Sequence, residues 1–177
     1  MKKNLFSIVK RTATIKNMAN TVRINHKISS LLKKNNLTIS SAESCTGGLL
    51  ASRLTNIAGS SSYFKTGFIT YNIESKLKYL KIDKNTISSY GSVSKECAKE
   101  MADNVKSLTN SEIGIATTGI LGPKTMENRS KGEVYIALSL PNKSTVKKLR
   151  LNGSRITIKK EAVTQALQLL YQELCQL

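Results

Sequence analysis

The stretch SAESCTGG, residues 41–48, places a serine two positions before a threonine and two glycines. A predicted strand delivers Ser44 to this turn, and a predicted helix begins directly after it. Glycines let a backbone approach a ligand closely, and N–H groups at a helix N-terminus point towards negative charge. The amides of Thr46, Gly47 and Gly48 could therefore form an oxyanion hole beside a nucleophilic Ser44, or a cradle for phosphate. A serine that only caps the helix is an equally weighted alternative.

A serine hydroxyl is a weak nucleophile and needs a base, but the chain has a single histidine, His26. His26 lies in a predicted amphipathic helix beside a basic leader, which argues against a Ser-His-Asp triad. The base would be a carboxylate, or a lysine whose pKa is lowered by burial or a nearby cation. Composition does not choose among the 28 basic residues. Cys45 is a rival nucleophile, although a cysteine in such a position more often fills buried space.

Hydrophobic periodicity predicts strands interleaved with helices. The predicted strands cover residues 37–42, 67–72, 112–119, 132–140 and 144–151, and the predicted helices cover residues 22–36, 49–57, 74–80, 94–108 and 155–177. Ser94 is the expected N-cap of the fourth helix, and Leu108 is expected on its apolar face. The last helix has a predicted apolar face formed by Ile158, Ala162, Val163, Ala166, Leu167, Leu170 and Leu174. The last two strands form a predicted antiparallel hairpin across Pro141 and Asn142. This order predicts one α/β domain with a mixed sheet.

Composition restricts the class of protein. Hydrophobic residues make up 40% of the chain and charged residues 22%, which is a globular balance. No apolar run approaches the ~20 residues that a membrane-spanning helix needs, so no membrane partner is expected. The net charge of +17 could attract nucleic acid, but the lysines are spread along the chain and no specific nucleic-acid partner is expected. The three cysteines form no CxxC pair, so neither a zinc site nor a disulfide is predicted, which favours the cytoplasm.

The first 42 residues contain nine Lys or Arg and no acid. We expect residues 1–19 to be a disordered basic leader, or translation to begin at Met18, and the folded domain to cover residues 20–177. An organellar transit peptide is the less favoured alternative, because the leader is not rich in arginine.

Four strings follow one another in the chain: SAESCTGG, AGSSSYFKTGFITYNIESK, GSVSKE and TTGILGP. Over about residues 22–177 the chain resembles the CinA C-terminal domain family, whose stand-alone members include nicotinamide-mononucleotide deamidases. The combination of ESCTGG with GxxTYxxExK is much more specific than either string. The resemblance implies a three-layer α/β/α sandwich, usually a homodimer. It also implies hydrolysis of nicotinamide mononucleotide to nicotinate mononucleotide and ammonia, without a metal or organic cofactor.

The same resemblance implies catalytic roles for three residues: Ser44 as nucleophile, Lys76 as base and Tyr71 as catalytic tyrosine. Tyr71 and Lys76 are five positions apart across a predicted strand-to-helix junction, which can direct both side chains into one cleft. Lys76 would take the hydroxyl proton of Ser44, and for this its amine must be uncharged. Without the family resemblance, a solvated helix lysine and a half-buried strand tyrosine would explain these residues better.

Two further segments are expected to hold the phosphoribosyl part of the substrate. TTGILGP, residues 117–123, ends a predicted buried strand, a common ligand-binding position in α/β proteins, with Thr118, Gly119 and Gly122 as candidates. A tight turn that needs glycine would explain the same residues. NGSR resembles the family's Gly-Asp-Arg segment, which implies a substrate-binding role for Arg155. A guanidinium can pair with phosphate through two hydrogen bonds, although an exposed arginine near a helix start is the plainer alternative.

The chain departs from the family pattern on the substrate side. The run KTMENRSKG, residues 124–132, lacks the paired glycines and the proline of the family, and Gly-Asp-Arg has become Gly-Ser-Arg. A related amidase with another small amide substrate, a non-catalytic nucleotide-binding module and a basic nucleic-acid-associated protein are therefore the alternative functions. The larger N-terminal domain of full-length CinA proteins has no counterpart in this chain, so none of its activity is expected.

Overall fold

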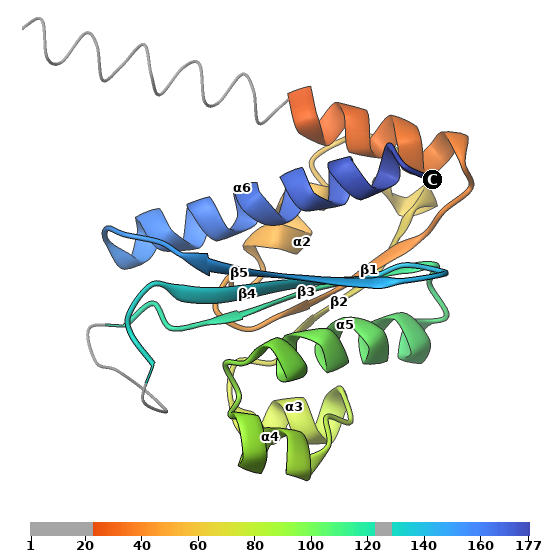
Figure 1. Cartoon of the computed structure of the whole chain (residues 1–177). Coiled ribbons are helices and arrows are strands. Elements are labelled where there is room, and N and C mark those ends of the chain that lie inside the picture. Colours follow the sequence, from red (N-terminus) through yellow and green to blue (C-terminus); the bar gives the residue numbers. More distant parts are fainter. Residues whose placement is uncertain (1–22, 123–128) are drawn as a thin grey trace, which may run out of the picture.

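The computed structural model describes residues 23–122 and 129–177, so the predicted leader lies outside the described residues. A five-stranded sheet with the order β2-β1-β3-β4-β5 forms its middle layer (Figure 1). β1, β2 and β3 run parallel, whereas β4 is antiparallel to β3 and β5 is antiparallel to β4. The predicted mixed sheet and its late hairpin are confirmed. The strands are β1 (Ile39–Glu43), β2 (Phe64–Ile69), β3 (Ile113–Gly119), β4 (Glu133–Ser139) and β5 (Ser144–Arg150).

Helices cover both faces of this sheet, which completes the predicted three-layer α/β/α fold (Figure 1). One face carries the helix over residues 23–34, α2 (Leu49–Leu54) and α6 (Arg155–Leu174). The other face carries α5 (Lys95–Thr109), with α3 (Ile73–Tyr79) and α4 (Lys84–Tyr90) beyond it. A 3-10 turn, η1 (Ser60–Ser62), precedes β2. In the described residues no helix is both long and apolar enough to cross a bilayer.

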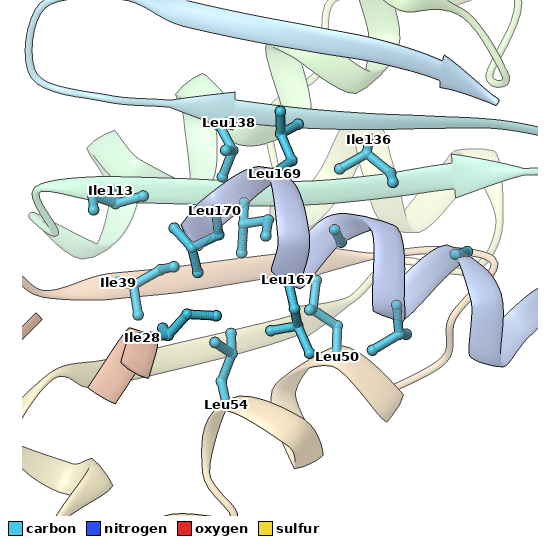
Figure 2. Packing of buried hydrophobic residues seen from close by; sticks show 14 of the residues in the cluster. Ile28, Ile39, Leu50, Leu54, Ile113, Ile136, Leu138, Leu167, Leu169 and Leu170 are labelled. Carbon is cyan, nitrogen blue, oxygen red and sulfur yellow. The ribbon is translucent and has the colours of Figure 1, made fainter. Parts of the chain in front are cut away.

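The larger core lies between α6 and the sheet (Figure 2). The predicted apolar face of α6 is buried throughout, and burial of one such leucine side chain stabilises the fold by roughly 1.5–3 kcal/mol. These residues are Ile158, Ala162, Val163, Ala166, Leu167, Leu170 and Leu174. Aliphatic side chains therefore supply most of this core.

The second core lies between α5 and the opposite face of the sheet. Ser94 caps α5 as predicted, because its Oγ accepts the N–H of Cys97 at 3.0 Å. The helix packs so closely that a Cβ at Gly114 of β3 would lie 2.0 Å from the carbonyl oxygen of Ala102. Leu108 was expected on the buried face but is 49% exposed, because it lies in the last turn, beyond the buried part of the helix.

Two elements differ from the prediction. β2 begins and ends three residues earlier than the predicted strand at 67–72, because its pairing with β1 starts at Phe64 and leaves Tyr71 in the following loop. α4 was not predicted, since it buries no residue and so has no apolar periodicity to detect. Its first turn is stabilised instead by the side chain of Asp83, which accepts the N–H of Asn85 at 2.8 Å.

Candidate active site

The turn after β1 is organised by the buried carboxylate of Glu43. Glu43 accepts hydrogen bonds from the Thr46 hydroxyl at 2.6 Å and from the N–H groups of Gly48 at 2.9 Å, Leu50 at 3.0 Å and Ala51 at 2.7 Å. Gly48, the N-cap of α2, has no side chain to cap the helix. A strand carboxylate therefore satisfies the first N–H groups of α2 and places negative charge where a helix N-terminus favours it.

The two glycines of the turn have positive φ values, 56° at Gly47 and 91° at Gly48. L-amino acids with a side chain rarely adopt this conformation, which explains the glycine pair. Thr46 points inward, with its hydroxyl 2.6 Å from the hydroxyl of Thr117 on β3. The Gly48 N–H already donates to Glu43, so it does not contribute to the oxyanion hole predicted from the sequence. These contacts hold the turn that follows Ser44 in a fixed conformation.

Ser44 and Lys76, 32 positions apart in the chain, meet at the end of the parallel strands. The Lys76 Nζ donates to the Ser44 Oγ at 2.9 Å and to the Thr70 carbonyl oxygen at 2.8 Å. Both side chains are buried, with exposed fractions of 7% for Ser44 and 2% for Lys76. An uncharged amine at this distance would be placed to accept the proton of the serine hydroxyl.

The path of the chain from β2 to α3 explains how Lys76 reaches Ser44. The Thr70 N–H donates to the Glu43 carbonyl oxygen at 2.8 Å, so the chain stays paired with β1 beyond the last residue of β2. Asn72 then caps α3 by accepting the N–H of Ser75 at 2.8 Å. One turn later, Lys76 points back towards the end of β1.

A cleft of about 830 Å³ opens at these two residues, a size common for small-molecule sites. It brings together seven of the predicted site residues, whereas Thr46, Gly47 and Gly48 are not among the lining residues. The predicted residues that line it are Ser44, Tyr71, Lys76, Thr118, Gly119, Gly122 and Arg155. The other described lining residues are Cys45, Asn72, Ile73, Glu74, Ser92, Val93, Ile120 and Leu121.

Tyr71 and Arg155 lie together in this cleft. Tyr71 is 58% exposed, and its phenol oxygen accepts a hydrogen bond from the Arg155 Nη2. Arg155 is the first residue of α6, next to the N-cap Ser154. The exposed guanidinium adds to the positive end of the helix dipole, which favours an anionic group in this part of the cleft.

The three predicted residues of the TTGILGP segment have different surroundings. The Thr118 hydroxyl donates to the Ser92 carbonyl oxygen at 2.8 Å and fixes one wall of the cleft. A Cβ on Gly119 would lie 2.7 Å from Val134 Cγ2, so close packing of β3 on β4 explains this glycine. Among the described atoms, a Cβ on Gly122 would meet only Arg155, at 4.0 Å.

Cys45 also lines the cleft, but its chemistry differs from that of Ser44. Burial raises the pKa of the Cys45 thiol to about 12, although the nearby positive charge of Lys76 acts in the opposite direction. A thiol with this pKa is almost entirely protonated at neutral pH, and the thiolate is the nucleophilic form. The structure therefore favours Ser44 over Cys45 as the nucleophile.

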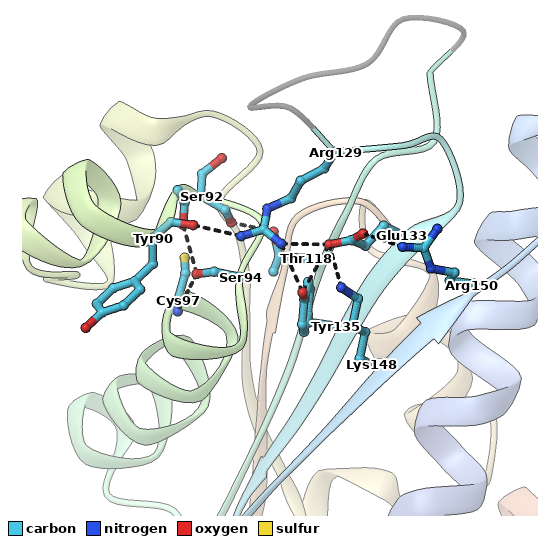
Figure 3. A network of polar contacts seen from close by, with 11 residues as sticks. Tyr90, Ser92, Ser94, Cys97, Thr118, Arg129, Glu133, Tyr135, Lys148 and Arg150 are labelled. Carbon is cyan, nitrogen blue, oxygen red and sulfur yellow. Dashed lines mark hydrogen bonds and ion pairs between the residues drawn. The ribbon is translucent and has the colours of Figure 1, made fainter.

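A polar network that was not predicted from the sequence supports the segment that carries the lining residues Ser92 and Val93 (Figure 3). The Arg129 guanidinium donates to the Tyr90 carbonyl oxygen at 3.0 Å and to the Glu133 carboxylate at 2.7 Å. Burial alone would raise the pKa of Glu133, but hydrogen bonds from Arg129, Tyr135 and Lys148 outweigh it and lower the pKa. Arg129 and Glu133 are only four positions apart, but a short-range pattern could not reveal the link from Arg129 to Tyr90, which is 39 positions away.

In the part of the chain that the structure describes, no group of three or more His, Cys, Asp or Glu residues could hold a metal ion.

Comparison with known proteins identifies the family. The model of the CinA C-terminal domain matches residues 21–174. The chain belongs to the CinA family. Proteins named as competence-damage inducible are similar to this CinA domain: one from Clostridium novyi is 44% identical over 154 residues, and one from Clostridium botulinum is 47% identical over 148 residues. The alignments cover 86% and 83% of this chain but only 37% and 36% of those relatives, so the chain spans little more than a third of their length.

Solved structures show the same fold over nearly their whole length. A CinA superfamily protein from Klebsiella pneumoniae superimposes with a TM-score of 0.85 at 27% identity, covering 89% of this CinA domain and 99% of that chain. A competence/damage inducible protein from Agrobacterium tumefaciens gives a TM-score of 0.78 at 32% identity, covering 84% and 94%. The family and the fold expected from the sequence strings are both confirmed.

Proposed function

We propose that this CinA domain hydrolyses the carboxamide of nicotinamide mononucleotide, giving nicotinate mononucleotide and ammonia. The observation that carries the proposal is the 2.9 Å contact between the Lys76 Nζ and the Ser44 Oγ. This pair lies in a cleft large enough for a mononucleotide, with Arg155 available for its phosphate.

The reaction divides into two half-reactions. The Ser44 Oγ attacks the amide carbon while Lys76, uncharged at this moment, takes the hydroxyl proton. Lys76 then returns the proton to the amide nitrogen, the C–N bond breaks, and ammonia leaves behind an ester on Ser44. Water attacks this ester with Lys76 again as base, which releases the carboxylate and restores the serine. Tyr71 and Arg155 would position the substrate.

Two substitutions test this mechanism. Ser44→Ala removes the nucleophile, and Lys76→Met removes the base while keeping a side chain of similar length. Each should lower ammonia release from nicotinamide mononucleotide by at least about a thousandfold. Ser52→Ala on α2 and Lys78→Met on α3 are the controls. Both residues are exposed and do not line the cleft, so these substitutions should leave the rate of ammonia release unchanged.

Circular dichroism and thermal melting would show whether each variant remains folded. If Ser44→Ala or Lys76→Met is folded and still releases ammonia at the wild-type rate, the mechanism is contradicted. If the wild-type protein binds the mononucleotide and releases no ammonia, a nucleotide-binding module is the better description. Release from other small amides but not from the mononucleotide would favour a related amidase.

The remaining expectations are proposals of the same kind. We propose a homodimer and a cytoplasmic location, with no specific nucleic-acid or membrane partner and no metal or organic cofactor.

A further inference from the structure

The charges around the cleft are distributed unevenly. Glu74 is the one acid among the described lining residues, and Arg155 is the basic residue there apart from Lys76, the amine that acts as base in its uncharged form. Glu74 lies in the first turn of α3, two positions before Lys76, and its side chain is exposed. Within residues 23–122 and 129–177, its carboxylate forms no hydrogen bond and no ion pair. Its carboxylate is therefore available to a ligand.

The lining near these charges is mostly apolar. Ile73, Val93, Ile120 and Leu121 contribute aliphatic side chains, and Tyr71 contributes an aromatic ring. Apolar walls with a few polar groups are typical of sites that bind flat, ring-containing ligands. The charged groups then determine which rings are accepted and how they are oriented.

We infer that Glu74 is a specificity residue that selects amides carried on a positively charged ring. The inference rests on the proposed function and extends it. The pyridine nitrogen of nicotinamide mononucleotide is bonded to ribose and carries a positive charge, whereas its phosphate is negative. Arg155 is opposite in charge to the phosphate, and Glu74 is opposite in charge to the ring. The carboxamide then lies at Ser44. Without Glu74, no acid among the described lining residues would offset the charge of the cationic ring, and Arg155 would repel it.

The test compares two ligands that differ in ring charge. Reduced nicotinamide mononucleotide keeps the carboxamide, ribose and phosphate, but its dihydropyridine ring is neutral. Calorimetry in the Ser44→Ala background measures binding of both ligands without turnover. Adding Glu74→Gln should weaken binding of the oxidised form about three- to fivefold, as expected for a partly solvated charge pair, and leave the reduced form unchanged. Adding Glu74→Asp should restore part of the preference.

Glu96→Gln is the matched control, because Glu96 is also an exposed acid in the first turn of a helix, α5, but does not line the cleft. It changes the net charge equally and should leave both affinities unchanged. Equal weakening of both ligands by Glu74→Gln, no weakening at all, or the same selective loss in Glu96→Gln would overturn the inference. Because these measurements need no turnover, they are independent of ammonia release by the wild-type protein, on which the proposed function depends.

Discussion

At the scale of single residues, the surroundings of Ser44 and Cys45 have opposite effects on their reactivity as nucleophiles. Ser44 contacts an amine at 2.9 Å, which is the arrangement that activates a hydroxyl. Cys45, the intrinsically better nucleophile, is held in its protonated form because burial raises its pKa to about 12. Sequence position alone does not distinguish these two neighbours, whereas their surroundings do.

The raised pKa of Cys45 predicts a pH dependence of stability. Above pH 9.0, the ordinary thiol value, the unfolded chain loses this proton while the folded chain keeps it until about pH 12. The thiol's contribution to stability is thus complete below pH 9.0 and is lost as the pH rises through this window. The unfolding free energy of the wild type should fall by up to about 1.4 kcal/mol per pH unit more than that of Cys45→Ala. Urea unfolding between about pH 8 and pH 11 measures both slopes; parallel slopes would contradict the prediction.

At the scale of elements, the short helix α2 depends on strand β1. The Glu43 carboxylate at the end of β1 accepts three N–H groups from the start of α2 and one hydroxyl from the turn between them. A six-residue helix is not stable by itself, so its position is set by such contacts and by packing. Ser44 lies directly after Glu43 and takes its orientation from the same turn.

Replacing this carboxylate should therefore affect both stability and activity. Glu43→Gln removes the charge and places an NH₂ group opposite N–H donors, which should lower the unfolding free energy by about 2–4 kcal/mol. Ammonia release per folded molecule should also fall, because the turn that holds Ser44 is disturbed. Thermal melting and ammonia assays at a temperature where the variant is folded would measure the two effects.

Glu112→Gln is the control for this prediction. Glu112 directly precedes the central strand β3, at the end of the strands opposite to Ser44, where its carboxylate accepts the Thr38 N–H at 2.7 Å. Its replacement should destabilise the protein without changing ammonia release per folded molecule. Unchanged release in Glu43→Gln, or an equal loss in both variants, would show that the Glu43 carboxylate has no particular role at the site.

At the scale of the whole molecule, charge opposes the proposed self-association. Each chain carries a formal net charge of +17 at pH 7, so two copies repel each other at low ionic strength. Salt screens this repulsion between exposed charges, whereas it leaves apolar contacts in place. A homodimer of this protein should consequently become tighter when salt is added.

Sedimentation velocity at about 50 mM and about 500 mM salt tests this expectation, since the Debye length shortens several-fold between them. The dimer should have twice the 19.4 kDa mass of the chain, and its dissociation constant should be lower at the higher salt concentration. Dissociation by added salt would indicate an interface built on ion pairs. A monomer under both conditions would contradict the proposed homodimer.

Local patterns were sufficient for most of the elements and for several site residues. The face of α6 repeats at helical spacing, and the Ser94 cap follows from the residue type and its position, so both were predicted. The glycine pair after Cys45 correctly indicated a tight turn, because positive φ values restrict the residue type locally. The strings around Ser44 and Lys76 identified the family, whereas the catalytic roles of these residues stay predictions.

Only the tertiary structure decided which groups meet and which are already occupied. The sequence did not reveal that Glu43 takes the Gly48 N–H, that Arg129 joins Tyr90 to Glu133, or that Glu74 is the acid among the described lining residues. Arg129 and Tyr90 are distant in the chain and adjacent in space. Glu43 and Gly48 are only five positions apart, but their contact depends on the conformation of the turn between them. Short-range periodicity carries no information about such pairs, so their chemistry becomes visible only once the sheet has brought the strand ends together.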